Sequence, residues 1–203
     1  MVKKEPNIIF DIGQVLLQYQ PIKNLKKALR DEAKAKDIFS KTFGSQDWLK
    51  LDRGHITRQE LIAKLTAKYP EDKEIIRTAI KDWPRYLEPI TANKKVLLAL
   101  KEQDYPLYYL SNFPKEGFEE SQELFPFLKN FAAGLISAEV GHIKPEKEIY
   151  EAFLAKVNID PARTIFIDDS KENTKAAADL GWQTIHFNNE TDLQQEFKQL
   201  GLL

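Results

Sequence analysis

Short runs of β-branched and aromatic residues recur along the chain, and polar residues or glycine follow them. The first run, residues 7–11, has the sequence Asn-Ile-Ile-Phe-Asp and ends at Asp11. Similar runs occupy residues 106–110, 133–137, 164–168 and 183–187. Runs of this length, bounded by turn-forming residues, are typical of buried strands. The pattern therefore predicts a buried sheet of these five segments.

Amphipathic segments separate the predicted strands. Residues 93–102 and 147–157 each gather apolar side chains on one helical face, and residues 170–180, rich in alanine and lysine, stop at Gly181. Alternating strands and helices predict an α/β protein with a Rossmann-like, three-layer α/β/α core around a parallel sheet. In such sheets ligands bind beyond the carboxyl ends of the strands.

One long segment does not follow this alternation. Ser111 comes 100 positions after Asp11, whereas a strand–helix–strand unit needs only about 30 residues. Residues 18–88 contain no clear strand but several amphipathic helices, such as 57–69 and 73–83. We expect a core of residues 1–17 and 89–203, with a small helical cap domain, residues 18–88, inserted between its two parts.

Composition narrows the classes of function. The net charge of −1 gives no overall attraction to nucleic acid or to anionic membranes. The absence of cysteine excludes disulfides, a thiol nucleophile and Cys-ligated zinc, and it suits a reducing compartment. No apolar stretch is long enough for a signal peptide or a membrane span. We expect a cytoplasmic protein, monomeric or weakly dimeric, with neither nucleic-acid nor membrane partners.

The candidate chemical residues all lie just after predicted strands. They are Asp11, Ser111, Lys144 and the pair Asp168–Asp169. At one edge of a sheet, three carboxylates repel one another more than a single lysine can offset. A Mg²⁺ ion, which prefers oxygen ligands, can complete the charge balance. Lysine and metal together then form a positive socket for a phosphoryl group.

Four motifs stand in the order found in the haloacid dehalogenase superfamily, which the chain resembles over its whole length. They are Phe-Asp-Ile-Gly-Gln-Val at 10–15, Leu-Ser-Asn at 110–112, Lys-Pro at 144–145 and Phe-Ile-Asp-Asp-Ser at 166–170. Each motif alone is common, but four in order at strand ends are specific together. The insertion after the first motif is similar to the helical cap of that family.

The resemblance implies a role for each motif residue that faces the phosphate. Asp11 is implied to attack phosphorus and form an aspartyl phosphate, which divides hydrolysis into two steps. Ser111 and the backbone at Asn112 are implied to hold phosphoryl oxygens. Lys144 is implied to pair with both the nucleophile and the phosphate. The substrate is expected to be a small phosphorylated metabolite, such as a sugar phosphate.

The same resemblance implies a Mg²⁺ site. Asp11, Asp169 and the backbone carbonyl of Gly13 are the implied direct ligands. Asp168 is expected beside the metal, through a water or a hydrogen bond. Asn173, one helical turn further on, is a candidate bridge to the phosphate-binding loop.

Gly13 departs from the usual phosphatase pattern. Members of the superfamily usually carry a second aspartate there, which protonates the leaving oxygen and then activates water. The Asp-x-Gly-x-Val version resembles a subgroup that includes sugar-phosphate phosphatases. General acid–base help contributes roughly 10²–10⁴-fold in rate. We therefore expect slow turnover, or a preference for leaving groups that need little protonation.

Three alternatives differ from a phosphatase in testable ways. A catalytically silent member that binds a phosphorylated ligand is compatible with Gly13. A dehalogenase uses the same aspartate without Mg²⁺, but Asp168–Asp169 argues against it. A receiver domain carries its acidic pair early in the chain rather than late.

Some conspicuous residues have plainer interpretations. His142, near Lys144, is a candidate replacement acid, but a surface histidine is the favoured interpretation. Residues 53–55 form either a helix–helix linker or a cap loop that reaches substrate. Trp48, Trp83 and Tyr86 are expected to fill the cap core.

Overall fold

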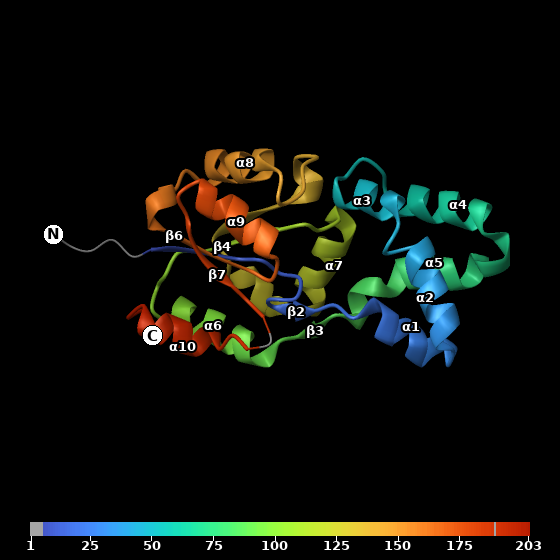
Figure 1. Ribbon diagram of the computed structural model, residues 1–203, viewed down its shortest axis with the longest axis horizontal. Helices are drawn as coiled ribbons and strands as arrows, with labels where there is room; N and C mark the ends of the chain where they lie inside the picture. Colours follow the sequence, from blue (N-terminus) through green and yellow to red (C-terminus); the bar gives the residue numbers. More distant parts are fainter. Residues whose placement is uncertain (1–5, 189) are drawn as a thin grey trace.

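The computed structural model describes residues 6–188 and 190–203, so residues 1–5 and 189 of the predicted core lie outside the described part (Figure 1). Five parallel strands form the central sheet in the order β5-β4-β1-β6-β7. The strands are β1 (Asn7–Phe10), β4 (Leu107–Ser111), β5 (Ala133–Ile136), β6 (Thr164–Asp168) and β7 (Gln183–His186). Each predicted strand is confirmed to within one residue at either end, and so is the α/β class.

Helices cover both faces of the sheet because successive strand residues point to opposite sides. Ile8 and Phe10 of β1 belong to one apolar cluster, together with side chains of α6 and α10. Ile9 belongs to a second cluster with α8 and α9. Figure 1 shows α8 and α9 on one side of the sheet and α6 and α10 on the other. These helices are α6 (Thr91–Glu102), α8 (Lys147–Val157), α9 (Lys171–Asp179) and α10 (Leu193–Gln199).

Helix α7 (Lys115–Leu124) follows β4 and was not predicted from the sequence. Gly117 in its first half weakens the helical signal, because glycine costs about 1 kcal/mol against alanine inside a helix. The structure explains the glycine. A Cβ at this position would lie 2.3 Å from Cζ2 of Trp83, so only glycine allows this close approach.

Between β2 (Leu17–Gln18) and β3 (Glu88–Pro89) the chain forms a group of α-helices, which we call the helical insert, residues 19–87. β2 and β3 pair antiparallel, so the chain leaves the core and returns to it side by side. The helices are α1 (Pro21–Leu29), α2 (Glu32–Lys41), α3 (Gln46–Asp52), α4 (Arg58–Lys68) and α5 (Lys73–Asp82). The insert also contains two short 3₁₀ helices, η1 (Pro70–Asp72) and η2 (Trp83–Tyr86). The core contains three more, η3 (Pro126–Asn130), η4 (Ser137–Glu139) and η5 (Pro161–Arg163).

Aromatic side chains join the insert to the core. Trp83 packs against Trp48 with ring centroids 5.6 Å apart, and against Phe113 of the core at 5.3 Å. Tyr19 adds an edge contact to Trp83 at 5.8 Å. The expectation of buried aromatic residues is confirmed for Trp48 and Trp83 but is wrong for Tyr86, whose side chain is exposed at the insert surface.

Two arginines of the insert also bind acidic residues of the core. Arg58 reaches two carboxylates of α7, with Nη1 2.6 Å from Glu120 and Nε 3.3 Å from Glu116. Arg53 pairs with Glu146 and donates a 3.0 Å hydrogen bond to the carbonyl of Gly141. The insert is therefore held against the core by charge-assisted hydrogen bonds as well as by aromatic packing. No helix within the described residues is long and apolar enough to cross a bilayer.

Candidate active site

The predicted chemical residues meet at the carboxyl edge of the sheet, in its centre. β1 lies between β4 and β6, so the residues that end these three strands are neighbours. Asp11 follows β1 directly, Ser111 ends β4 and Asp168 ends β6. Parallel pairing places all three on the same edge.

Asp11 is held through one of its two carboxylate oxygens. Its Oδ1 accepts hydrogen bonds from the backbone N–H of Ile12 at 2.7 Å and from the hydroxyl of Ser111 at 2.6 Å. Nζ of Lys144 lies 3.0 Å from the same oxygen. Among the described residues, Oδ2 accepts no hydrogen bond. The carboxylate is thus fixed in orientation and presents one oxygen for another partner.

Lys144 is buried and fully engaged. Its ammonium lies 2.6 Å from Oδ2 of Asp168 and donates a 2.9 Å hydrogen bond to the carbonyl of Leu110, in addition to its contact with Asp11. Burial alone lowers the pKa of Lys144, but the charges of Asp11 and Asp168 outweigh it, and the net shift is upward. The lysine is therefore a permanent cation. The implied pairing of Lys144 with phosphate stays a prediction, since protein groups take up its three N–H donors.

A reciprocal amide contact fixes the lysine loop to the loop after β4. Nδ2 of Asn112 donates to the carbonyl of Lys144 at 3.0 Å, and the N–H of Lys144 donates to Oδ1 of Asn112 at 2.8 Å. The Asn112 side chain is used in this way to join two loops. The phosphate contact that the family resemblance implies for this residue therefore falls to its backbone.

The two consecutive aspartates differ in their surroundings. Asp168 is completely buried, and besides Lys144 it accepts hydrogen bonds from Asn173 Nδ2 at 2.9 Å and from the N–H of Ser170 at 2.8 Å. Asp169 is exposed, and its backbone carbonyl lies 3.0 Å from Nε2 of His186. Protein groups satisfy both oxygens of Asp168, whereas the Asp169 side chain faces solvent. Within the described residues the Asn173 side chain therefore supports Asp168 and makes no hydrogen bond to the loop after β4.

The donor set suits a divalent cation. One carboxylate oxygen from each of Asp11, Asp168 and Asp169 lies within 4.8 Å of the others. Burial raises the pKa of Asp11 to about 7, Asp168 and Asp169 add to the rise, and Lys144 opposes it. A carboxylate nucleophile must be ionised, so three carboxylates beside one lysine call for further positive charge. A hard divalent cation, which prefers oxygen ligands, would supply this positive charge.

Gly13 leaves space where a second carboxylate could stand. A Cβ built on this residue meets no atom within 4 Å. Its backbone is also outside the left-handed region, since the glycines with positive φ are Gly54, Gly141, Gly181 and Gly201. Neither packing nor backbone geometry therefore requires glycine at this position.

His142 lies at the surface, with Nδ1 3.4 Å from a carboxylate oxygen of Glu146. The structure instead draws attention to Asp52, at the end of α3, which the sequence analysis did not single out. Its partly buried carboxyl makes no hydrogen bond or ion pair with the described residues, and burial raises its pKa to about 7. The only sequence signal was its position next to residues 53–55.

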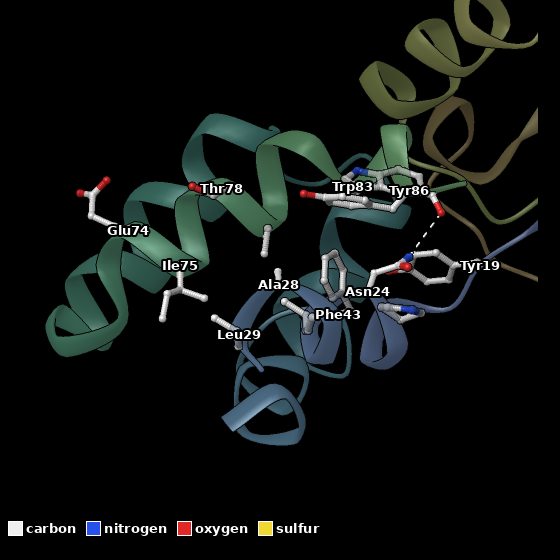
Figure 2. A pocket seen from close by; sticks show the side chains of 13 residues that line it. Tyr19, Asn24, Ala28, Leu29, Phe43, Glu74, Ile75, Thr78, Trp83 and Tyr86 are labelled. Carbon is white, nitrogen blue, oxygen red and sulfur yellow. Dashed lines mark hydrogen bonds between the residues drawn. The ribbon is translucent and has the colours of Figure 1, made fainter. Parts of the chain in front are cut away.

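A cavity of about 270 Å³ lies inside the helical insert, between α1 and α5 (Figure 2). Its lining is mostly apolar, with Glu74 and Ile75 at one end and Tyr19, Trp83 and Tyr86 at the other. None of the predicted site residues lines it. The cavity is therefore distinct from the carboxylate cluster.

Comparisons with known proteins agree with this geometry. Residues 8–187 match a family model described as haloacid dehalogenase-like hydrolase. The chain is 28% identical over 192 residues to sesquiterpene phosphatase astK of Aspergillus oryzae, covering 95% of this chain and 94% of that protein. It is 24% identical over 202 residues to D-ribitol-5-phosphate phosphatase of Bacteroides thetaiotaomicron, covering 94% and 95%.

A solved structure extends the likeness to three dimensions. A HAD family enzyme from Bacteroides thetaiotaomicron, in complex with magnesium and inorganic phosphate, has a TM-score of 0.77 and 28% identity, covering 96% of this chain and 100% of that one. The resemblance inferred from the four motifs is confirmed. This chain belongs to the haloacid dehalogenase-like hydrolase family.

Proposed function

We propose that the protein is a Mg²⁺-dependent phosphatase that hydrolyses a phosphate monoester of a small alcohol through an aspartyl phosphate at Asp11. The observation that carries the proposal is how the two oxygens of the Asp11 carboxylate are held. Ser111 and Lys144 fix its Oδ1, while Oδ2 accepts no hydrogen bond within the described residues. An oriented carboxylate beside a buried cation is suited to nucleophilic attack on phosphorus.

In the first step a carboxylate oxygen of Asp11 bonds to phosphorus, and the bond from phosphorus to the alcohol oxygen breaks. Ser111 and the backbone at Asn112 hold phosphoryl oxygens, and Lys144 offsets their charge. Water then attacks the aspartyl phosphate, releases phosphate and restores the Asp11 carboxylate. Asp11, Asp169 and the carbonyl of Gly13, with Asp168 beside them, would hold Mg²⁺, which would supply positive charge near the phosphoryl oxygens.

The named relatives support a phosphate ester of an alcohol as the substrate. One is a sesquiterpene phosphatase and another a D-ribitol-5-phosphate phosphatase, so their alcohols differ widely in polarity. The relative with magnesium and inorganic phosphate supports the metal. We further propose that residues 18–88 act as a cap over the core, residues 1–17 and 89–203, and that the cap selects the alcohol.

The test is phosphate release with Mg²⁺ across a panel of ribitol 5-phosphate, glucose 1-phosphate, farnesyl phosphate, AMP and para-nitrophenyl phosphate. We expect release from at least one of these esters, loss of release with EDTA, and loss in Asp11→Asn. Asp31→Asn, a change at a helix N-cap remote from the carboxylate cluster, is the matched control. No release from any ester by the metal-loaded protein would argue against a phosphatase, and release that survives in Asp11→Asn would exclude the assigned nucleophile.

Gly13 favours one alternative, a silent member that binds a phosphorylated ligand without turning it over. In that case inorganic phosphate or an ester would raise the melting temperature in the presence of Mg²⁺, with no hydrolysis of any ester in the panel. The phosphatase proposal expects both binding and release. A halide-releasing enzyme, in contrast, would keep its activity in EDTA.

A further inference from the structure

The proposed reaction needs a proton donor that Gly13 cannot supply. The leaving alcohol oxygen has to be protonated, and the attacking water has to lose a proton. His142 is turned to Glu146 at the surface, and His186 lies beside the carbonyl of Asp169. Under the proposed cap arrangement, the side of the site that faces the leaving oxygen belongs to the helical insert.

Asp52 belongs to the helical insert, and hydrogen bonds connect its backbone to the loop after β4, which carries the proposed phosphate-binding residues. The hydroxyl of Ser137 donates to the backbone carbonyl of Asp52. The same hydroxyl accepts a 2.9 Å hydrogen bond from the N–H of Phe113. Phe113 is two residues after Ser111, which contacts Asp11. Through Ser137, these two hydrogen bonds hold the Asp52 backbone close to the loop after β4.

Tyr19 ties the insert to the other flank of the site. The backbone N–H and carbonyl of Tyr19 bond to the side-chain amide of Gln14 at 3.2 and 2.9 Å, which ties Tyr19 to the loop after β1. Burial and then the charge of Asp52 raise the pKa of Tyr19 well above its usual value. The insert is therefore tied through Tyr19 to the loop that follows β1 and through the Asp52 backbone to the loop that follows β4, which are the loops that flank Asp11.

The end of α3 is also held rigidly. Arg53, the next residue, binds the carboxylate of Glu146 and the carbonyl of Gly141. Gly54 adopts a positive φ of 68°, and a Cβ there would lie 2.4 Å from the carbonyl oxygen of Ala138. The Asp52 backbone is fixed on both sides, whereas its carboxyl has no partner in the described part of the chain. Unpaired polar groups in such a place call for an explanation.

The protonation state of Asp52 suits acid–base chemistry. Burial raises the pKa of its carboxyl to about 7. A general acid works best when its pKa is close to the operating pH, because both protonation states are then accessible. Asp52 can therefore hold a proton at neutral pH and release it during a reaction.

We propose that Asp52 of the helical insert is the acid–base residue of this enzyme and replaces the carboxyl that is absent at Gly13. The proposal rests on the proposed phosphatase function. As the bond from Asp11 to phosphorus forms and the bond from phosphorus to the alcohol oxygen breaks, the Asp52 carboxyl gives its proton to that oxygen. In the second step the Asp52 carboxylate takes a proton from the attacking water while the bond from phosphorus to Asp11 breaks. Asp52 ends the cycle protonated, as it began.

The experiment compares Asp52→Asn with the wild type on two esters in single turnover. One is the alkyl phosphate of the panel that the wild type cleaves fastest, and the other is para-nitrophenyl phosphate. We expect cleavage of the alkyl ester to slow about 10²-fold or more in Asp52→Asn, because the alkoxide needs a proton. Release of nitrophenolate in the first turnover should change less than about threefold, since this leaving group departs as an anion. Later turnovers of both esters should be slow, which gives a burst of about one nitrophenolate per enzyme.

Two further variants sharpen the test. Asp47→Asn, on the same helix but paired with Lys50 and Lys64 away from the core, should behave as the wild type. Gly13→Asp in the Asp52→Asn background should restore alkyl cleavage at least tenfold, since the structure has room for that side chain. Asp52→Glu, which retains a carboxyl, should keep part of the alkyl activity if Asp52→Asn is poorly folded.

Equal slowing of both esters in the first turnover, or alkyl cleavage as fast as in Asp47→Asn, would overturn the assignment of Asp52. The phosphatase proposal would stand in either case, because the wild type would still release phosphate and Asp11→Asn would not. An absence of wild-type release from every ester would overturn both proposals.

Discussion

Lys144 and Asp168 form a buried ion pair, with Nζ of the lysine 2.6 Å from Oδ2 of the aspartate. Both side chains are at most 1% exposed. The same ammonium lies 3.0 Å from Oδ1 of Asp11, so Asp168 holds Lys144 beside the proposed nucleophile. Asp168 thus has a positional role that does not depend on direct contact with a substrate.

Replacing Asp168 with alanine should lower the free energy of unfolding by about 3–5 kcal/mol, because a buried cation loses a partner. Urea unfolding in EDTA measures this without interference from bound metal. Asp179→Ala is the matched control, since Asp179 forms an exposed pair with Lys175 on α9. The control should change stability by less than about 1 kcal/mol. Equal losses in the two variants would contradict the positional role of Asp168.

Asp169→Asn should separate metal binding from folding. Although Asp169 is exposed on one side, partial burial of its carboxyl and then the charge of Asp168 raise its pKa, so the ionised form disfavours the folded state at neutral pH. In EDTA the variant should melt at a higher temperature than the wild type. Mg²⁺ should raise the melting temperature of the wild type by mass action and leave the variant nearly unchanged. A similar Mg²⁺ shift in both proteins would remove Asp169 from the proposed ligand set.

Asp52 should make the metal-free protein less stable as the pH rises. Its pKa is about 7 when folded and 3.8 in an ordinary environment, so between these values the folded state binds the proton more tightly. The unfolded state then carries fewer protons, and the free energy of unfolding falls from about pH 4 until it levels off above about pH 7. Above pH 7, Asp52→Asn should be more stable than the wild type by about 1–2 kcal/mol, allowing for partial exposure.

Denaturant unfolding of both proteins in EDTA at pH 4.5 and pH 8 tests this sign. The stability difference between variant and wild type should grow with pH. The other raised carboxyls, Asp11 and Asp169, are common to both proteins and cancel in the comparison. A difference that shrinks with pH would mean that the charged form of Asp52 is stabilised in the fold.

Arg53→Ala should reduce catalysis more than stability. The variant loses the contacts to Glu146 and Gly141 that fix the residue after Asp52. A misplacement of about 1 Å can cost up to 10²-fold in rate, so we expect kcat/KM to fall at least about tenfold. The free energy of unfolding should fall by only about 1 kcal/mol. Arg77→Ala, which removes an exposed pair with Glu74 on the insert, should change neither quantity appreciably.

The sequence was sufficient for the sheet and the carboxylate cluster because both depend on local patterns. A buried strand shows itself as a short apolar run, and a parallel sheet gathers the residues that end its strands. Asp11, Ser111 and Asp168 end or follow strands β1, β4 and β6, which are neighbours in space. Their proximity therefore followed from strand ends alone, before any side-chain contact was known.

The remaining contacts of the site could not be predicted from the sequence because they join segments that are far apart along the chain. The hydroxyl of Ser137 bonds to the backbone of Asp52 across 85 positions, and Arg53 pairs with Glu146 across 93. Neither pair produces a periodic pattern in the sequence. The strands β2 and β3, of two residues each, are too short to give an alternation at all. Asp52 becomes conspicuous only when its neighbours in space are known.

The pairing of β2 with β3 has a consequence for how such a protein can change. Leu17 lies opposite Pro89 and Gln18 opposite Glu88, so the two chain crossings are one strand spacing apart, about 4.8 Å. Seen from the sheet, the whole insert occupies the position of a hairpin turn. Its length and sequence can vary without shifting the register of the strand that leads to Asp11. The half proposed to bind the alcohol is thereby free to diverge, while the half proposed to bind the phosphate stays in place.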